Sequence, residues 1–462
     1  MEKGTMHSED GVRAGDGACR VSIECTHLYQ HGLNTGIQRV VRNLVRQGEA
    51  CAAELGLEVQ PVILTRGGFA RVDSQKLLPR KKGFFGRVWM AGRRVFFRMS
   101  SAGSGGKKAG GGEAEGSKRS LSLKGAIIRL AYGLVGLWEN LLQRWRSVRL
   151  AGGRVHAGPS DLLILADVSW KSELLWEHVQ AWRKQGGRVA IICYDLIPIQ
   201  TPEFVSELAS RSFRRYMTNA SQMVDFTIGI SKHSAQEFLE FARSIDQPGW
   251  TAERCGSFRL GADEWAKGKV GPSEDAKATL ASLKGKPYFV AVGTVEIRKN
   301  HRAMLDAFDR LWAEGVDAAL VIIGNYGWRS PEIAERIHAS PEFGKRLFWF
   351  TGAPDADLEM WYEQCRAVLM SSKAEGFGLP VVEALVRGKQ VIASSIPTHV
   401  EIADGYVTFF EPDDVVALAA AIKRNLAGEK KEIAGYRWPG WRESAKEFLT
   451  ECRRMLALGP RA

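Results

Sequence analysis

Two carboxylates separated by seven residues form the most specific chemical pattern in the sequence. Glu375 and Glu383 enclose Gly-Phe-Gly-Leu-Pro-Val-Val, with a strand pattern at 367–370 before them and a helix pattern after the loop. Ligands of open α/β folds bind beyond the carboxyl ends of strands, so Glu375 is expected where a ligand would lie. Gly376 and Gly378 let the backbone approach a ligand, and the helix N-terminus favours an anion. The spacing alone also fits a loop Glu followed by a helix-surface Glu, so both interpretations stay open.

A second pattern places two cations after a strand. The segment Val-Gly-Thr-Val-Glu-Ile-Arg-Lys-Asn occupies residues 292–300, and Gly293 ends the expected strand. Arg298 and Lys299 then precede an expected helix, where cations oppose the helix dipole and therefore need a reason. A bound diphosphate would explain cations at this position, because Arg offers a planar fork of donors and Lys a point charge. The alternative is a solvated helix N-terminus.

Short Val- and Ile-rich segments alternate with amphipathic helix patterns along most of the chain. Strands are expected at 20–25, 57–64, 161–166, 188–194 and 225–230 in the first half, and at 288–292, 319–323, 347–350, 367–370, 390–393 and 407–410 in the second. Apolar strands interleaved with helices indicate parallel sheets that are buried on both faces. The sequence therefore predicts an α/β protein of two tandem Rossmann-like domains with a cleft between them.

Breaks in this alternation predict the domain boundaries. The expected parts are a flexible N-terminus at 1–18, a first domain at 19–263, a charged linker at 264–285, a second domain at 286–436 and a C-terminal helix at 437–462 that packs back toward the first domain. Residues 76–157 interrupt the first domain as a basic insertion.

Composition excludes several classes of protein. The chain has 462 residues, of which 45% are hydrophobic and 25% charged, so disorder throughout is excluded. It has no run of 18 uncharged apolar residues and no apolar stretch at its N-terminus, so neither a membrane-spanning helix nor a secretory signal is expected. The seven cysteines form no CxxC pair and are expected to be reduced core residues of a cytoplasmic protein.

The net charge of +12 originates in the insertion. Residues 76–154 hold 18 Lys and Arg but three acids, which leaves the rest of the chain nearly neutral. Within 81–150, aromatic and aliphatic residues are interleaved with cations on both sides of a Gly/Ser/Lys-rich linker. This pattern favours an interfacial anchor on an anionic membrane, and a solvated insertion is the alternative. Nucleic-acid binding is not expected, because the aromatics follow helix spacing.

Together, these segments resemble glycosyltransferase family 4, the retaining nucleotide-sugar transferases of GT-B fold. The resemblance rests on GTVEIRKNHRAMLDAF and EGFGLPVVEAL in the second domain. In the first domain it rests on Asn34-Thr-Gly-Ile-Gln-Arg-Val40 and Tyr194-Asp-Leu-Ile-Pro198, which are similar to loops of bacterial members that build polysaccharides. It covers roughly residues 20–75 and 160–425.

The resemblance implies a role for each of these residues. Arg298 and Lys299 would hold the donor diphosphate, and Glu375 would contact the sugar at the reacting face. Glu383 would hydrogen-bond the ribose, and Asp195 would support the acceptor. The remaining donor-binding positions are Gly36, Gly293, Gly376, Phe377 and Gly378.

Two positions depart from the usual pattern of the family. Tyr194 stands before Asp195 where many relatives have His. Thr294 replaces a basic residue of the phosphate loop, which leaves Arg298 and Lys299 with more of the diphosphate charge.

The implied reaction transfers a hexosyl group from a nucleotide-diphosphate sugar to a surface polysaccharide or a lipid-linked glycan, with cations in place of a metal. Mannose, and GDP-mannose as its donor, are favoured. No metal site or cofactor is expected, because Asp355 and Asp357, which mimic a metal-binding DxD pair, open an expected helix. The enzyme is expected in the cytoplasm, peripheral on the inner membrane face. The alternatives are a GT-B epimerase or phosphorylase, and a catalytically idle scaffold that binds sugar nucleotides or membranes.

Overall fold

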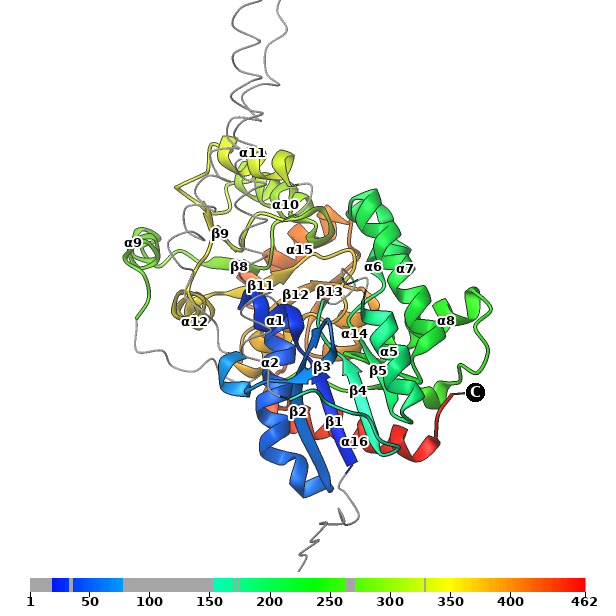
Figure 1. Ribbon diagram of the computed structural model, residues 1–462. Coiled ribbons are helices and arrows are strands. Elements are labelled where there is room, and N and C mark those ends of the chain that lie inside the picture. The colour runs from blue at the N-terminus through cyan, green and yellow to red at the C-terminus, as the bar shows by residue number, and fades with distance from the viewer. Residues whose placement is uncertain are drawn as a thin grey trace, which may run out of the picture.

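The computed structural model describes residues 19–32, 36–77, 153–168, 172, 174–262, 271–327 and 330–461. The N-terminal segment 1–18 and the expected membrane anchor at 81–150 lie outside these residues. The described chain forms two α/β domains, each built on its own sheet (Figure 1). The predicted fold class is confirmed.

The first domain is built on a seven-stranded sheet in the order β3-β2-β1-β4-β5-β6-β7. Its strands are β1 (Cys19–Glu24), β2 (Leu57–Thr65), β3 (Gly68–Arg71), β4 (Asp161–Leu165), β5 (Arg188–Cys193), β6 (Phe226–Gly229) and β7 (Cys255–Ser257). Its helices are α1 (Thr26–His31), α2 (Gly36–Cys51), α5 (Leu175–Lys184), α6 (Ile197–Gln200), α7 (Glu207–Met223) and α8 (Lys232–Ser244). Only β3 runs antiparallel to its neighbour. The sequence patterns missed β3 (Gly-Phe-Ala-Arg) and β7 (Cys-Gly-Ser), because neither is a continuous apolar segment.

The second domain is built on a six-stranded parallel sheet in the order β10-β9-β8-β11-β12-β13. Its strands are β8 (Tyr288–Val292), β9 (Ala319–Ile323), β10 (Leu347–Phe350), β11 (Ala367–Met370), β12 (Val391–Ser394) and β13 (Thr408–Phe410). Its helices are α9 (Glu274–Ser282), α10 (His301–Ala313), α11 (Pro331–Ala339), α12 (Asp355–Gln364), α13 (Leu379–Val386), α14 (Pro397–Ala403) and α15 (Val415–Leu426). All six strands lie where the apolar segments predict them.

The helix α16 (Trp441–Leu458) returns from the second domain to the first, where it packs against α2 (Figure 1). Val40, Val41, Leu44 and Val45 repeat at helical spacing along α2 and are buried. The buried face of α16 is formed by residues such as Phe448, Leu449 and Cys452. Each large apolar side chain buried in this way contributes about 1.5–3 kcal/mol. The first domain therefore depends on a helix that follows the second domain in the sequence.

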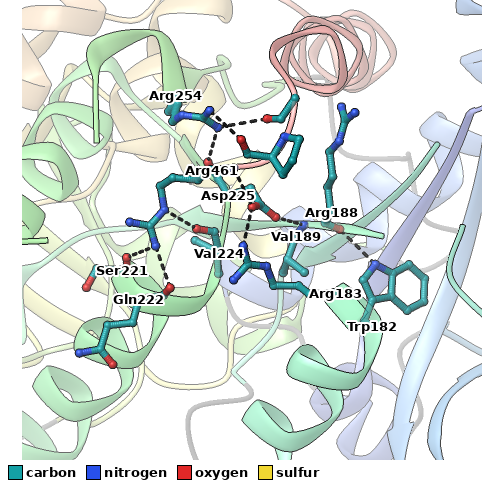
Figure 2. A network of polar contacts seen from close by, with 12 residues as sticks. Trp182, Arg183, Arg188, Val189, Ser221, Gln222, Val224, Asp225, Arg254 and Arg461 are labelled. Carbon is teal, nitrogen blue, oxygen red and sulfur yellow. Dashed lines mark hydrogen bonds and ion pairs between the residues drawn. The ribbon is translucent and has the colours of Figure 1, made fainter. Parts of the chain in front are cut away.

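The residues after α16 are held at the end of α7 (Figure 2). The guanidinium of Arg461 donates to the carbonyls of Ser221, Gln222 and Val224 at 2.6–3.1 Å. These carbonyls lie at the C-terminal end of α7, where helix carbonyls lack intrahelical partners and a cation is favoured. The backbone N–H of Arg461 also donates to Asp225, at 3.1 Å. This contact fixes the C-terminal segment on the first domain.

None of the helices in the described part of the chain combines the length and apolar content needed to span a bilayer.

Candidate functional site

The loop between β11 and α13 is held in one conformation by glycine and by packing. Gly378 has a φ of 111°, in the region that favours glycine. A Cβ on Gly378 would also lie 2.9 Å from Cδ2 of His399. Phe377 is buried, and its ring lies 5.8 Å from that of Trp438. Glycine geometry and packing therefore hold the loop that carries Glu375 in one conformation.

The two cations of the sequence pattern both contact Glu375. Nη1 of Arg298 lies 2.6 Å from Oε2 of Glu375, and Nζ of Lys299 lies 2.5 Å from Oε1. Arg298 also pairs with Glu296 at 2.7 Å, and Ser372 donates to Glu375 at 2.6 Å. The structure thus joins the two sequence patterns into one cluster of alternating charges.

The backbone conformation around Arg298 and Lys299 explains why these cations lie next to Glu375. Asn300 adopts the left-handed conformation at φ 53°, and its side chain donates to the carbonyl of Pro412 at 2.6 Å. Gly293 has a φ of 145°, and a Cβ there would lie 3.3 Å from Cε of Lys299. A Cβ on Gly324 would come within 1.8 Å of the carbonyl oxygen of Gly293. Small residues therefore let the end of β8 turn tightly and present Lys299 to Glu375.

The charges keep Glu375 ionised. Burial alone would raise its pKa, but the positive charges of Arg298 and Lys299, with the hydrogen bonds from Lys299 and Ser372, hold the pKa well below the usual range. Burial also disfavours the charged form of Arg298 and by itself would lower its pKa. The carboxylates of Glu375 and Glu296 outweigh this and raise the pKa of Arg298 above its ordinary value. A polyanion that reached this cluster would meet two cations that share Glu375, of which Arg298 also pairs with Glu296.

Asp195 approaches the same loop from the first domain. It follows β5, and its Oδ1 accepts a hydrogen bond from the backbone N–H of Ile197 at 3.1 Å. A Cβ on Gly376 would lie 2.0 Å from the carbonyl oxygen of Tyr194 and 3.2 Å from Cβ of Asp195. Gly376 is therefore needed for the two domains to meet here. The side of Gly376 that a Cβ would occupy thus faces the first domain, and its expected role in donor binding stays a prediction.

Burial raises the pKa of Asp195 to about 6, although the charge of Arg298 and the N–H of Ile197 oppose the rise. The carboxylates of Glu237 and Glu375 contribute to the rise. Asp195 is therefore mostly ionised at pH 7 and takes up a proton as the pH falls below about 6. A carboxylate of this kind can accept a hydrogen bond from a substrate hydroxyl near neutral pH.

Glu383 lies in the second turn of α13 and is buried, with 2% of the residue exposed. Its Oε1 accepts from Nη1 of Arg39, on α2 of the first domain, at 2.7 Å. Gly36 begins the same helix, three residues before Arg39. A Cβ on Gly36 would meet no atom within 4 Å, so packing in the described chain does not require glycine there.

Sequence reasoning gave no role to three residues that join the domains. Arg39 pairs with Glu383. The hydroxyl of Ser231 donates to the carbonyl of Gly376 at 3.0 Å. Glu401 accepts from the backbone N–H groups of Lys232 and His233, at 2.7 and 2.9 Å. Ser231 also caps α8, and the Ser-x-x-Ser spacing was a visible signal for that role.

Asp357 has a structural partner. Its two oxygens accept from the N–H and the hydroxyl of Ser273, at 2.6 and 2.7 Å, so it links α12 to the start of α9. Both acids, Asp355 and Asp357, lie in the first turn of α12, as expected for acids that open a helix, although the helix begins at Asp355 and not at the predicted Leu358. Its N-cap is Pro354, which makes no side-chain hydrogen bond. Within the described ranges no group of three or more His, Cys, Asp or Glu side chains could hold a metal ion.

Comparison with known proteins identifies the second domain. Residues 272–434 match the family of glycosyl transferases group 1, so this part of the chain is a domain of that family. Of the solved structures, Anabaena Alr3699/HepE in complex with UDP-glucose has a similar fold, with a TM-score of 0.53 and 14% identity over 95% of this chain and 98% of that one. The two-domain architecture is that of the GT-B fold.

Two curated relatives from Escherichia coli are similar in sequence. One is the serotype-specific mannosyltransferase WbdA, 31% identical over 307 residues, which are 63% of this chain and 36% of that protein. The other is the O-antigen chain mannosyltransferase B, 33% identical over 169 residues, which are 36% of this chain and 42% of that protein. The chain thus matches less than half the length of either relative.

Proposed function

We propose that this protein is a retaining glycosyltransferase of family 4. It transfers a hexosyl group, with mannose favoured, from a nucleotide-diphosphate sugar to a polysaccharide or lipid-linked glycan. The observation that carries the proposal is the cluster of Arg298 and Lys299 on Glu375, which adjoins Asp195 of the first domain. The mannosyltransferase relatives support the choice of sugar and of acceptor class.

In this proposal the two cations replace a metal ion. Arg298 and Lys299 exchange part of their contact with Glu375 for the donor diphosphate and stabilise the charge that develops as the phosphate departs. Glu375 then faces the sugar, while the ionised Asp195 accepts a hydrogen bond from the acceptor hydroxyl. The bond from C1 of the sugar to the phosphate oxygen breaks, and a bond from C1 to the acceptor oxygen forms on the same face. The proton of the acceptor hydroxyl passes to the departing diphosphate, which leaves as the nucleoside diphosphate.

A thermal-shift panel without added metal tests the donor assignment. The donors are GDP-mannose, GDP-fucose, UDP-glucose, UDP-N-acetylglucosamine and dTDP-rhamnose. We expect one donor, GDP-mannose first, to stabilise the protein, and we expect Lys299→Ala to weaken its binding roughly 10- to 150-fold through loss of a charged hydrogen bond. Lys373→Ala is the matched control, because Lys373 pairs with Asp413 at 2.7 Å. Equal donor affinity in the two variants would exclude the phosphate role of Lys299.

Analysis of the reaction products separates glycosyl transfer from the alternative reactions, epimerisation and phosphorolysis.

The basic insertion at 81–150 is proposed to bind an anionic membrane at the inner face. The residues on either side of it are anchored on the first domain: Leu77 is buried, and the N–H of Arg71 donates to the carbonyl of Gly153 at 3.3 Å. A short Gly/Ser bridge can therefore replace 81–150 without disturbing the sheet. We expect the deletion variant to lose flotation with phosphatidylglycerol vesicles, while the full chain floats with these but not with phosphatidylcholine. Flotation of both proteins to the same extent would rule out the insertion as the anchor.

A further inference from the structure

An ion pair joins the two domains at Glu383. Nη1 of Arg39 lies 2.7 Å from Oε1 of Glu383, and the two residues are 344 positions apart in the sequence. The side chain of Glu383 is 3% exposed and that of Arg39 is 25% exposed. A carboxylate buried to this degree is costly without a partner, and Arg39 supplies both charge and a hydrogen bond.

Two arginines lie next to Glu383, and they contact different groups of this residue. A second arginine, Arg387, donates to the backbone carbonyl of Glu383 at 2.7 Å, and its guanidinium lies 5.5 Å from the ring centre of Tyr362. The carboxylate itself contacts Arg39. The charge of Glu383 is thus met by a residue of the other domain.

Other contacts hold the same surfaces together. The hydroxyl of Ser231 donates to the carbonyl of Gly376, and Glu401 accepts from two N–H groups at the start of α8. These bonds join the loop before α13, and the helix α14, to the first domain. The Arg39 contact differs from them because it is made to Glu383, the carboxylate to which the resemblance to family 4 gives the ribose of the proposed nucleotide donor.

We propose that Arg39 is a positioning residue that makes ribose recognition by Glu383 depend on the closed arrangement of the two domains. The inference rests on the proposed function and deepens it, since the ligand is the ribose of a ribonucleoside diphosphate. The guanidinium holds Oε1 and so fixes the plane of the carboxylate. The fixed carboxylate accepts from ribose hydroxyls, and opening of the domains removes Arg39 and leaves Glu383 without its orienting partner.

Ribose discrimination tests this role directly. Calorimetry compares GDP with 2′,3′-dideoxy-GDP, and UDP with 2′,3′-dideoxy-UDP, in the wild type, Arg39→Met and Arg39→Lys. We expect the wild type to prefer the ribose form of its nucleotide roughly 10- to 100-fold. Arg39→Met should lose most of this preference while its affinity for the dideoxy form stays near that of the wild type. Arg39→Lys should recover part of it, because a single N–O contact is made at 2.7 Å.

The control is a pair of similar burial inside one domain. Arg183 and Asp225 lie 3.1 Å apart, with side chains 33% and 1% exposed, beside the anchored C-terminal segment (Figure 2). Arg183→Met should affect stability and leave ribose discrimination unchanged. Equal loss of discrimination in Arg183→Met and Arg39→Met, or full discrimination in Arg39→Met, would overturn the proposal.

A nucleotide-free measurement separates this inference from the proposed function. Fluorophores on unnatural amino acids at the exposed positions Glu58 in β2 and Glu335 in α11 report the distance between the domains by energy transfer, without using the seven cysteines. We expect Arg39→Met to shift the distribution toward longer distances and Arg183→Met to leave it unchanged. An unchanged distribution in Arg39→Met would exclude its role in closure. Failure of every nucleotide to bind the wild type would reject the proposed function and, with it, the ribose role.

Discussion

Replacement of Glu375 by Gln is expected to lower transfer by roughly 10²- to 10³-fold, a typical cost of losing one oriented electrostatic contact at a reacting centre. Gln keeps the size of the side chain but removes the charge that faces Arg298 and Lys299. Because these cations are largely buried, losing their partner should also lower the free energy of unfolding by roughly 3–5 kcal/mol. Initial rates with the donor found by the panel and chemical denaturation measure the two effects.

Added pyrophosphate should separate the loss of stability in Glu375→Gln from its loss of transfer activity. Pyrophosphate supplies the missing negative charge, so it should raise the melting temperature of Glu375→Gln more than that of the wild type. Glu296→Gln is the matched control: the Glu296 carboxylate pairs with Arg298 at 2.7 Å, whereas that of Glu375 pairs with both cations. Turnover of Glu296→Gln should stay within about tenfold of the wild type. Turnover near the wild-type rate in Glu375→Gln, or equal losses in both variants, would exclude the proposed role of Glu375.

Replacement of Gly376 by Ala is expected to hold the domains apart. The added methyl would lie 2.0 Å from the carbonyl oxygen of Tyr194, and a backbone atom cannot move aside by changing rotamer. The loop or the domain must shift by an ångström or more, and a displacement of this size at reacting groups costs on the order of 10²-fold in rate. Steady-state kinetics should show the loss in kcat, and the energy-transfer pair at Glu58 and Glu335 should report longer distances.

Gly271→Ala is the control for this change, because a Cβ there would meet no atom within 4 Å. It should retain the wild-type rate and distance. If Gly376→Ala turned over at the wild-type rate, the close contact with Tyr194 would have no part in the reaction.

Much of the fold was predictable because buried parallel strands are continuous apolar segments. The strands of the second sheet were predicted to within one residue at each end, as in β12 (Val391–Ser394). The strand β7 (Cys255–Ser257) was missed because its three residues include a glycine and a serine, and its place depends on pairing with β6. Here tertiary contact decided the structure, and local pattern did not.

The candidate site was predictable within each domain and less so between them. Arg298, Lys299 and Glu375 follow neighbouring strands, β8 and β11, so the sheet edge brings them together. The partner of Glu383 could not be read from the sequence, because Arg39 belongs to another sheet and only the docking of the domains sets its position. Asp357 lies in the first turn of its own helix as expected, but its partner Ser273, 84 residues earlier in the chain, could not be predicted from the sequence.

The return of α16 to the first domain has a consequence for biosynthesis. The covering of α2 is encoded roughly 180 residues after the last strand of the first sheet, with the whole second domain in between. At the usual rate of 5–20 residues per second, a ribosome needs roughly 10–35 seconds to make that stretch. Throughout this interval the nascent first domain exposes the surface of α2 that α16 covers in the complete structure. The second domain is thus the first that can be complete, although it is the second to be translated, and chaperones that bind exposed apolar helices would meet the chain at this stage.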